Sequence, residues 1–294
     1  MRYFGLLTGL LAGALPAFAQ EGAGAELWRL ATLTVAVPPA LAQDGSAVFW
    51  NPAQAVPSGH GDLGLDLIQT PSVIGASGVL GAARFRVPKI GTLGLAYGRM
   101  SIGDLVQTSY SPEPDGPTIP FYTQTAALNW GLALGPTLVG ATIGYHETEL
   151  DQTTTDGWTA DVGATYRAGE TVRIAAATHF LGSHESAQDL YGGIEVRCWH
   201  GMLWKDTPAV FHARAGITAG GAAGTDEQLG AGLDIGRPVR LDALVTRQQS
   251  YGNDAWRFAA GIGIAIGHYQ VVFTRDGGTN DIGAAYRVGL AVAL

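Results

Sequence analysis

The sequence predicts a transmembrane antiparallel β-barrel of about fourteen strands, behind an export signal and an N-terminal plug segment. Three observations lead to this prediction: a leader with a cleavage pattern, a composition rich in glycine and poor in charge, and a repeated alternation. Gly occurs 43 times in 294 residues, and charged residues make up 14%. Strands that face lipid carry apolar residues where soluble strands carry polar ones, so this composition favours a barrel in a membrane.

The first nineteen residues have the pattern of a cleaved signal peptide. Met1-Arg2 is a short basic start, residues 4–15 are an apolar run too short to cross a bilayer, and Ala17-Phe18-Ala19 has the small-x-small cleavage pattern. We therefore expect residues 1–19 to be removed and the chain to reach the bacterial outer membrane. No later run approaches about 18 apolar residues, so we expect no transmembrane helix.

From residue 61 onward, segments of about ten alternating residues are separated by turns. In the segment 255–266, Trp256 and Phe258 fall on one face, while Arg257 and Gly261 fall on the other. A soluble sandwich also alternates, but the leader and the even strand count favour a barrel. The expected strands are 61–70, 77–87, 91–101, 120–132, 137–147, 156–167, 171–181, 188–198, 208–219, 227–236, 238–247, 255–266, 268–275 and 282–294.

The connections between these segments alternate in length and charge. Every second connection is a short turn beside basic residues, as at 87–90 and 134–136, whereas the others are longer and acidic, as at 102–119 and 147–156. Outer-membrane barrels have short periplasmic turns and longer outer loops, which gives the expected orientation. The connection 199–207 is an exception, a longer inner loop that we expect at the membrane interface.

The stretch 20–60 does not alternate, and we expect it to form a hatch or plug, with the barrel proper in 61–294. Asn51-Pro52 predicts a rigid turn that pins this segment to the wall, because Pro fixes φ and Asn bonds to nearby backbone. An ordinary turn before a strand is the alternative. The candidate hatch and turn residues are Asp44, Ser46, Trp50, Asn51 and Pro52.

Several charged residues fall on the inward face of the expected strands. Ionisable groups at membrane depth must pair or contact water, so they mark the lumen. They either form ion pairs that fill the barrel and hold the hatch, or line a path for a solute. These candidates are Arg84, Asp161, Arg173, His179, Arg214, Asp234, Arg240, Asp242 and Arg257.

Other functions find little support. The glycines in 261–267 alternate as in a strand and no helix follows them, unlike a dinucleotide-binding loop. The seven His residues lack metal-ligand spacing, so we expect no metal, no cofactor and no enzyme activity. The net charge of −8 argues against nucleic acid as a partner. Cys198 is the only cysteine, and we expect its thiol to be buried and inert.

Three motifs resemble a known superfamily. Residues 44–53 (DGSAVFWNPA) are similar to the signature ahead of the first strand in FadL-like and PorV-like outer-membrane proteins. Residues 91–105 resemble a hairpin of the PorV/PorQ branch, and residues 282–290 resemble the final strand, although the chain ends in Leu294 where Phe is usual. The resemblance implies a fourteen-stranded barrel with an N-terminal hatch.

The two branches imply different functions. The FadL branch admits small hydrophobic molecules past the hatch, and this passive channel is our leading expectation. A PorV-like scaffold for secretion-system proteins is the alternative, and a barrel enzyme is the least favoured. The partners expected are therefore outer-membrane lipids together with hydrophobic solutes or secreted-protein machinery.

Overall fold

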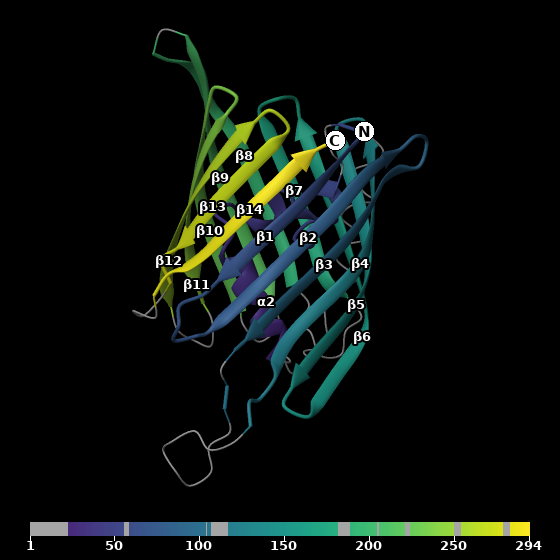
Figure 1. Cartoon of the computed structure of the whole chain (residues 1–294). Helices are drawn as coiled ribbons and strands as arrows, with labels where there is room; N and C mark the ends of the chain where they lie inside the picture. The colour runs from purple at the N-terminus through teal and green to yellow at the C-terminus, as the bar shows by residue number, and fades with distance from the viewer. Residues whose placement is uncertain are drawn as a thin grey trace.

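Fourteen antiparallel strands form one closed barrel in the computed structural model, which describes residues 23–55, 59–103, 105–106, 117–181, 189–204, 206–220, 224–249, 254–278 and 283–294 (Figure 1). Each strand pairs with its neighbours in sequence, and β1 pairs with β14 to close the ring. The predicted fold class is confirmed. The expected signal peptide, residues 1–19, lies outside the described residues. No helix in the described ranges is long and apolar enough to cross a membrane.

The strands match most of the expected segments closely. Their bounds are β1 (Gly61–Gln69), β2 (Ala76–Val87), β3 (Gly91–Ile102), β4 (Phe121–Leu134), β5 (Thr137–Leu150), β6 (Thr153–Ala168), β7 (Val172–Leu181), β8 (Asp189–Leu203), β9 (Thr207–Gly220), β10 (Gly224–Ile235), β11 (Val239–Gln248), β12 (Ala255–Ile266), β13 (Tyr269–Asp276) and β14 (Ala285–Ala293).

Two connections predicted as loops are strands instead, and their hairpins extend at opposite ends of the barrel (Figure 1). Residues 147–156 continue the β5–β6 ladder as far as Leu150 and Thr153, because their β-branched threonines favour extended backbone. The β8–β9 ladder likewise continues as far as Leu203 and Thr207. There a register shift between Arg197 and Trp199 interrupts the alternation that sequence reasoning depends on.

The thiol of Cys198 was wrongly predicted to be buried. The residue lies at this register shift, and its side chain is exposed. A bulge adds one residue to a strand and so interrupts the alternation of inward and outward side chains. The sequence position of a residue at a bulge therefore does not show whether its side chain is buried or exposed.

The outer face of the barrel is apolar around its whole circumference. Every strand carries at least one exposed large apolar or aromatic side chain, such as Leu95 at 61% exposure and Leu229 at 66%. The alternation predicted for β12 is confirmed, because Trp256 and Phe258 are exposed while the next residue inward, Ala259, is buried. Such a belt on a closed barrel matches the hydrocarbon of a bilayer.

Residues 23–55, here called the N-terminal segment, lie inside the barrel. The segment contains α2 (Ala23–Leu33), η1 (Pro39–Leu41), η2 (Ala47–Phe49) and η3 (Pro52–Ala55). α2 is enclosed by the wall (Figure 1) and contacts β3, β4 and β5, whereas η1 contacts β7, β8 and β9. η3 contacts β3 to β6. Because the segment spans the lumen between these strands, it determines the free space inside the barrel.

Replacement of Leu95 by Arg tests whether the outer face meets lipid. An arginine in the middle of a lipid-facing strand is expected to lower stability by about 2–4 kcal/mol. The matched variant Leu150→Arg, at the end of a strand, is expected to cost about 0–1 kcal/mol. Urea unfolding in lipid vesicles measures both changes, and equal costs at the two positions would contradict a bilayer around β3.

Candidate functional site

The lumen is the candidate site, and an apolar cluster occupies the part of it next to β2 and β3. The rings of Trp28, Phe49 and Trp50 pack together, with the Trp28 centroid 5.8 Å from Phe49 and 6.2 Å from Trp50. Leu80 and Met100 on the wall complete the cluster and are fully buried. Burial of these large side chains stabilises the segment inside the barrel.

Glycines on the inward face of the wall allow the segment to approach the strands closely. A Cβ at Gly193 would lie 2.7 Å from Leu41 Cγ, and a Cβ at Gly216 would lie 2.6 Å from Pro38 Cβ. These distances are too short for any other residue without movement of the segment. Wall glycines in such contact are Gly64 (β1), Gly98 (β3), Gly140 (β5), Gly163 (β6), Gly193 (β8) and Gly216 (β9).

Arg287 on β14 is the central polar contact between the segment and the barrel seam. Its guanidinium is buried, 2.8 Å from Asp44 of the segment and 3.1 Å from Asp66 of β1. It also donates to the hydroxyl of Ser46, which in turn donates to Asp44 Oδ1 at 3.0 Å. One cation therefore joins the first strand, the last strand and the segment.

Two further arginines bind a wall carboxylate and a backbone carbonyl of the segment. Arg84 holds Asp62 with Nε at 2.6 Å and Nη2 at 2.5 Å, and its Nη1 donates to the Gln54 carbonyl at 2.9 Å. Arg173 donates to the Leu41 carbonyl at 3.0 Å. Buried carbonyls need such donors, so the wall completes hydrogen bonds that the segment cannot make internally.

Asn51, predicted at a pinning turn, is fully buried against β6. Its Nδ2 donates to the Ala40 carbonyl at 2.8 Å and to Thr165 Oγ1 at 3.3 Å, while its Oδ1 accepts from the Ala53 amide at 2.9 Å. Pro52 begins η3 directly after it. The side chain thus orders the turn and contacts the wall at the same time.

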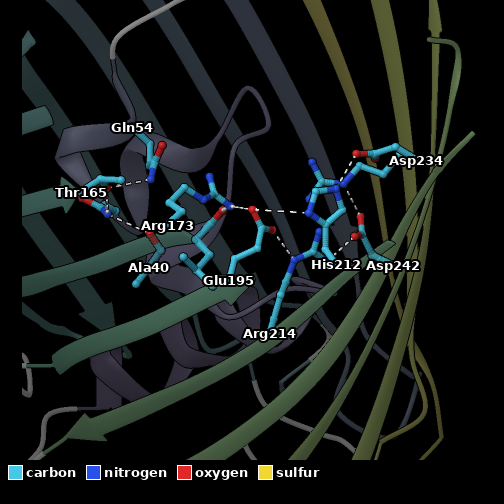
Figure 2. A network of polar contacts seen from close by, with 12 residues as sticks. Ala40, Gln54, Thr165, Arg173, Glu195, His212, Arg214, Asp234 and Asp242 are labelled. Carbon is cyan, nitrogen blue, oxygen red and sulfur yellow. Dashed lines mark hydrogen bonds and ion pairs between the residues drawn. The ribbon is translucent and has the colours of Figure 1, made fainter. Parts of the chain in front are cut away.

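The inward charges of β7 to β11 form a chain of ion pairs across neighbouring strands (Figure 2). Arg214 contacts Glu195 at 2.6 Å and Asp242 at 2.5 Å. Arg173 lies 3.3 Å from Glu195, and Arg240 lies 2.9 Å from Asp242. Opposite charges therefore alternate around this part of the wall.

Each of the nine ionisable residues predicted on the inward face contacts an ionisable residue of the opposite type, a carboxylate for a basic side chain or a basic side chain for a carboxylate. Beyond the pairs above, His179 lies 3.1 Å from Asp161, His212 lies 2.9 Å from Asp234, and Arg257 pairs with Asp276. The residues that sequence reasoning missed include Arg287, Asp66 and Glu195. The alternation of their strands predicts that these side chains face inward, but their ion-pair partners become neighbours only when the ring closes.

The segment leaves two large cavities toward the end of the barrel that carries the short turns. One of about 480 Å³ is lined by Arg173, Glu195 and His212, and another of about 420 Å³ is lined by Arg84 and Asp62. Within the described part of the chain, no three His, Cys, Asp or Glu side chains gather as metal ligands would. The lumen at this end is therefore a wide, charged vestibule.

No family model and no curated protein sequence matches the chain. Among solved structures, the toluene transporter TbuX of Ralstonia pickettii is similar at 12% identity and a TM-score of 0.49, over 84% of this chain and 92% of that one. The Acinetobacter baumannii outer membrane protein Omp33 has 9% identity and a TM-score of 0.46, over 80% and 98%. A triple mutant of Rhodopseudomonas blastica porin has 11% and 0.40, over 79% and 98%.

Replacement of Arg287 by Met tests the central contact. The change leaves Asp44 and Asp66 buried without their cation, which is expected to lower stability by about 3–5 kcal/mol. Hydrogen exchange of residues 42–46 should also rise, because Asp44 loses its anchor on the wall. Urea unfolding in vesicles and mass-resolved exchange measure the two effects.

Two controls accompany this variant. Arg247→Met removes an exposed ion pair with Asp254 on the same barrel and should change neither measurement. Adding Asp44→Asn and Asp66→Asn to Arg287→Met should recover part of the loss, since no carboxylate is then left unpaired. Unchanged exchange at residues 42–46 in Arg287→Met would rule out the anchoring role.

Proposed function

We propose that this chain is a bacterial outer-membrane barrel that conducts small molecules, with the N-terminal segment as its gate. One observation carries the proposal: a segment that precedes the first strand lies across the lumen and is bound to the wall mainly through side chains. Those contacts can exchange with water or solute without opening the strand ladder. The export signal expected in residues 1–19 agrees with this location.

The apolar outer belt supports insertion in a membrane. The strands have 8 to 16 residues, and a tilted strand needs about 9–11 to cross the hydrocarbon. Exposed aromatic side chains lie near both ends of strands, such as Trp158 near the start of β6 and Tyr166 near its end. With the short turns in the periplasm, the charged vestibule opens to the periplasm.

The apolar cluster of the segment supports a hydrophobic solute. A small apolar molecule can replace the contacts between Trp28 or Phe49 and the wall at little cost, because apolar packing is not directional. The resemblance to FadL-like proteins favours the same solute class. Displacement of α2 by such a molecule would weaken the seal and allow passage toward the vestibule.

The β8–β9 hairpin supports the second candidate, a PorV-like scaffold for secretion-system proteins. Its tip exposes Met202 at 65% and Trp204 at 81%, a surface suited to a protein partner. If this role holds, the double variant Met202→Ser with Trp204→Ser should lose co-purifying secretion proteins and keep its permeability.

A disulfide between the segment and the wall tests the gate. Leu41→Cys with Gly193→Cys brings two thiols into reach, because a Cβ at residue 193 would lie 2.7 Å from Leu41 Cγ. In a Cys198→Ser background, oxidation should lower the uptake of benzenesulfonate, an aromatic solute that lipid alone excludes, into proteoliposomes several-fold. Reduction should restore it.

The Cys198→Ser barrel alone is the control, and its uptake should not respond to oxidation or reduction. A chain that lacks residues 20–57 should be leakier than the full chain in liposome swelling. Uptake that is equal in the oxidised and reduced forms of the locked variant would contradict gating by the segment.

A further inference from the structure

The segment packs unevenly around the wall and leaves a narrow gap along β11 to β14. At Gly263 on β12, the three atoms nearest to a Cβ lie 3.7 to 3.9 Å away and belong to Arg240, Gln270 and Val272 of the wall, so no described atom of the segment lies nearer than these. A cavity of about 60 Å³ lies here, between the segment and the wall. This volume holds several water molecules, since one needs about 10–15 Å³ by this measure.

The charges beside the gap leave a cation open toward it. Arg240 lines the gap and is 26% exposed, and in the described part of the chain its only hydrogen bond runs from Nε to Asp242. Its two terminal nitrogens are therefore left for a ligand. A guanidinium end binds a carboxylate through two parallel hydrogen bonds.

The carboxylates beside the gap are already occupied. Asp242 accepts from both Arg214 and Arg240, at 2.5 and 2.9 Å. Asp44 accepts from Arg287 and Ser46. A cation entering the gap would meet no free acceptor of this kind, whereas an anion would meet the open end of Arg240.

The gap opens toward the vestibule and is closed at its other end by side chains. Gln43 and Gln270 line both the gap and the 420 Å³ cavity. Toward the long-loop end, Ala36 of the segment packs against Leu244 and Ala259, and this contact is the constriction. Leu244 is the largest of these three side chains, so its size determines the width of the constriction.

We propose that this gap is a second route, on which small carboxylates pass the seated segment. Arg240 selects the anion and Leu244 sets the width. The route differs from the displacement of α2 by hydrophobic solutes, because it needs only a change in the Leu244 side chain that closes the gap, and no movement of the segment. It rests on the proposed function in that the barrel must span a membrane and conduct.

Conductance in planar lipid bilayers tests the route, with gradients of potassium chloride and of sodium acetate. The unmodified barrel should show a small conductance whose reversal potential favours chloride and acetate over the cations. Arg240→Gln should abolish this preference, and Arg240→Lys should keep it in part. Leu244→Ala should raise the conductance several-fold, and Gly263→Leu, which fills the gap, should lower it several-fold.

Gly193→Leu is the matched control, since its side chain meets Leu41 and should loosen the segment instead of filling the gap. Its conductance should rise. If Gly193→Leu conducts but Arg240→Gln and Gly263→Leu equal the unmodified barrel in selectivity and conductance, the route is wrong and the channel stands. If neither Gly193→Leu nor the barrel without residues 20–57 conducts, the proposed function itself fails.

Discussion

The buried guanidinium of Arg287 is the interaction on which the rest of the structure depends. It lies where β14 meets β1, so it can pair with Asp66 only when the ring is closed. Its pairing with Asp44 makes the position of the segment depend on the same closure. A buried cation between two carboxylates is costly to leave incomplete, which ties barrel and segment into one unit.

Inward glycines and inward charged residues hold the segment in different ways. The glycines at β1, β3, β5, β6, β8 and β9 let backbone and apolar atoms approach the wall, which supplies close packing without direction. The arginines supply direction, because each meets a specific carbonyl or carboxylate. Beside Gly263 the segment lies farther from the wall, and a gap remains.

The alternation in the sequence is sufficient to predict the barrel. Strand number and face follow from local alternation, so parity alone predicts an inward position for residues such as Arg84, Arg173 and Arg214. Which charged residues pair with one another depends on the closed ring. Arg287 and Asp44 are 243 positions apart, so no local sequence pattern predicts their ion pair. The bulge beside Cys198 prevents the prediction of inward and outward positions from alternation, because one extra residue exchanges the inward and outward faces of the strand.

The seam contact also orders events in time. Asp44 and Asp66 lie near the beginning of the chain, whereas Arg287 lies near its end. The anchor of the segment is therefore incomplete until the last strand has joined the first. Until then the carboxylates of Asp44 and Asp66 lack their cation, so closure of the ring and completion of the segment's anchor are one event.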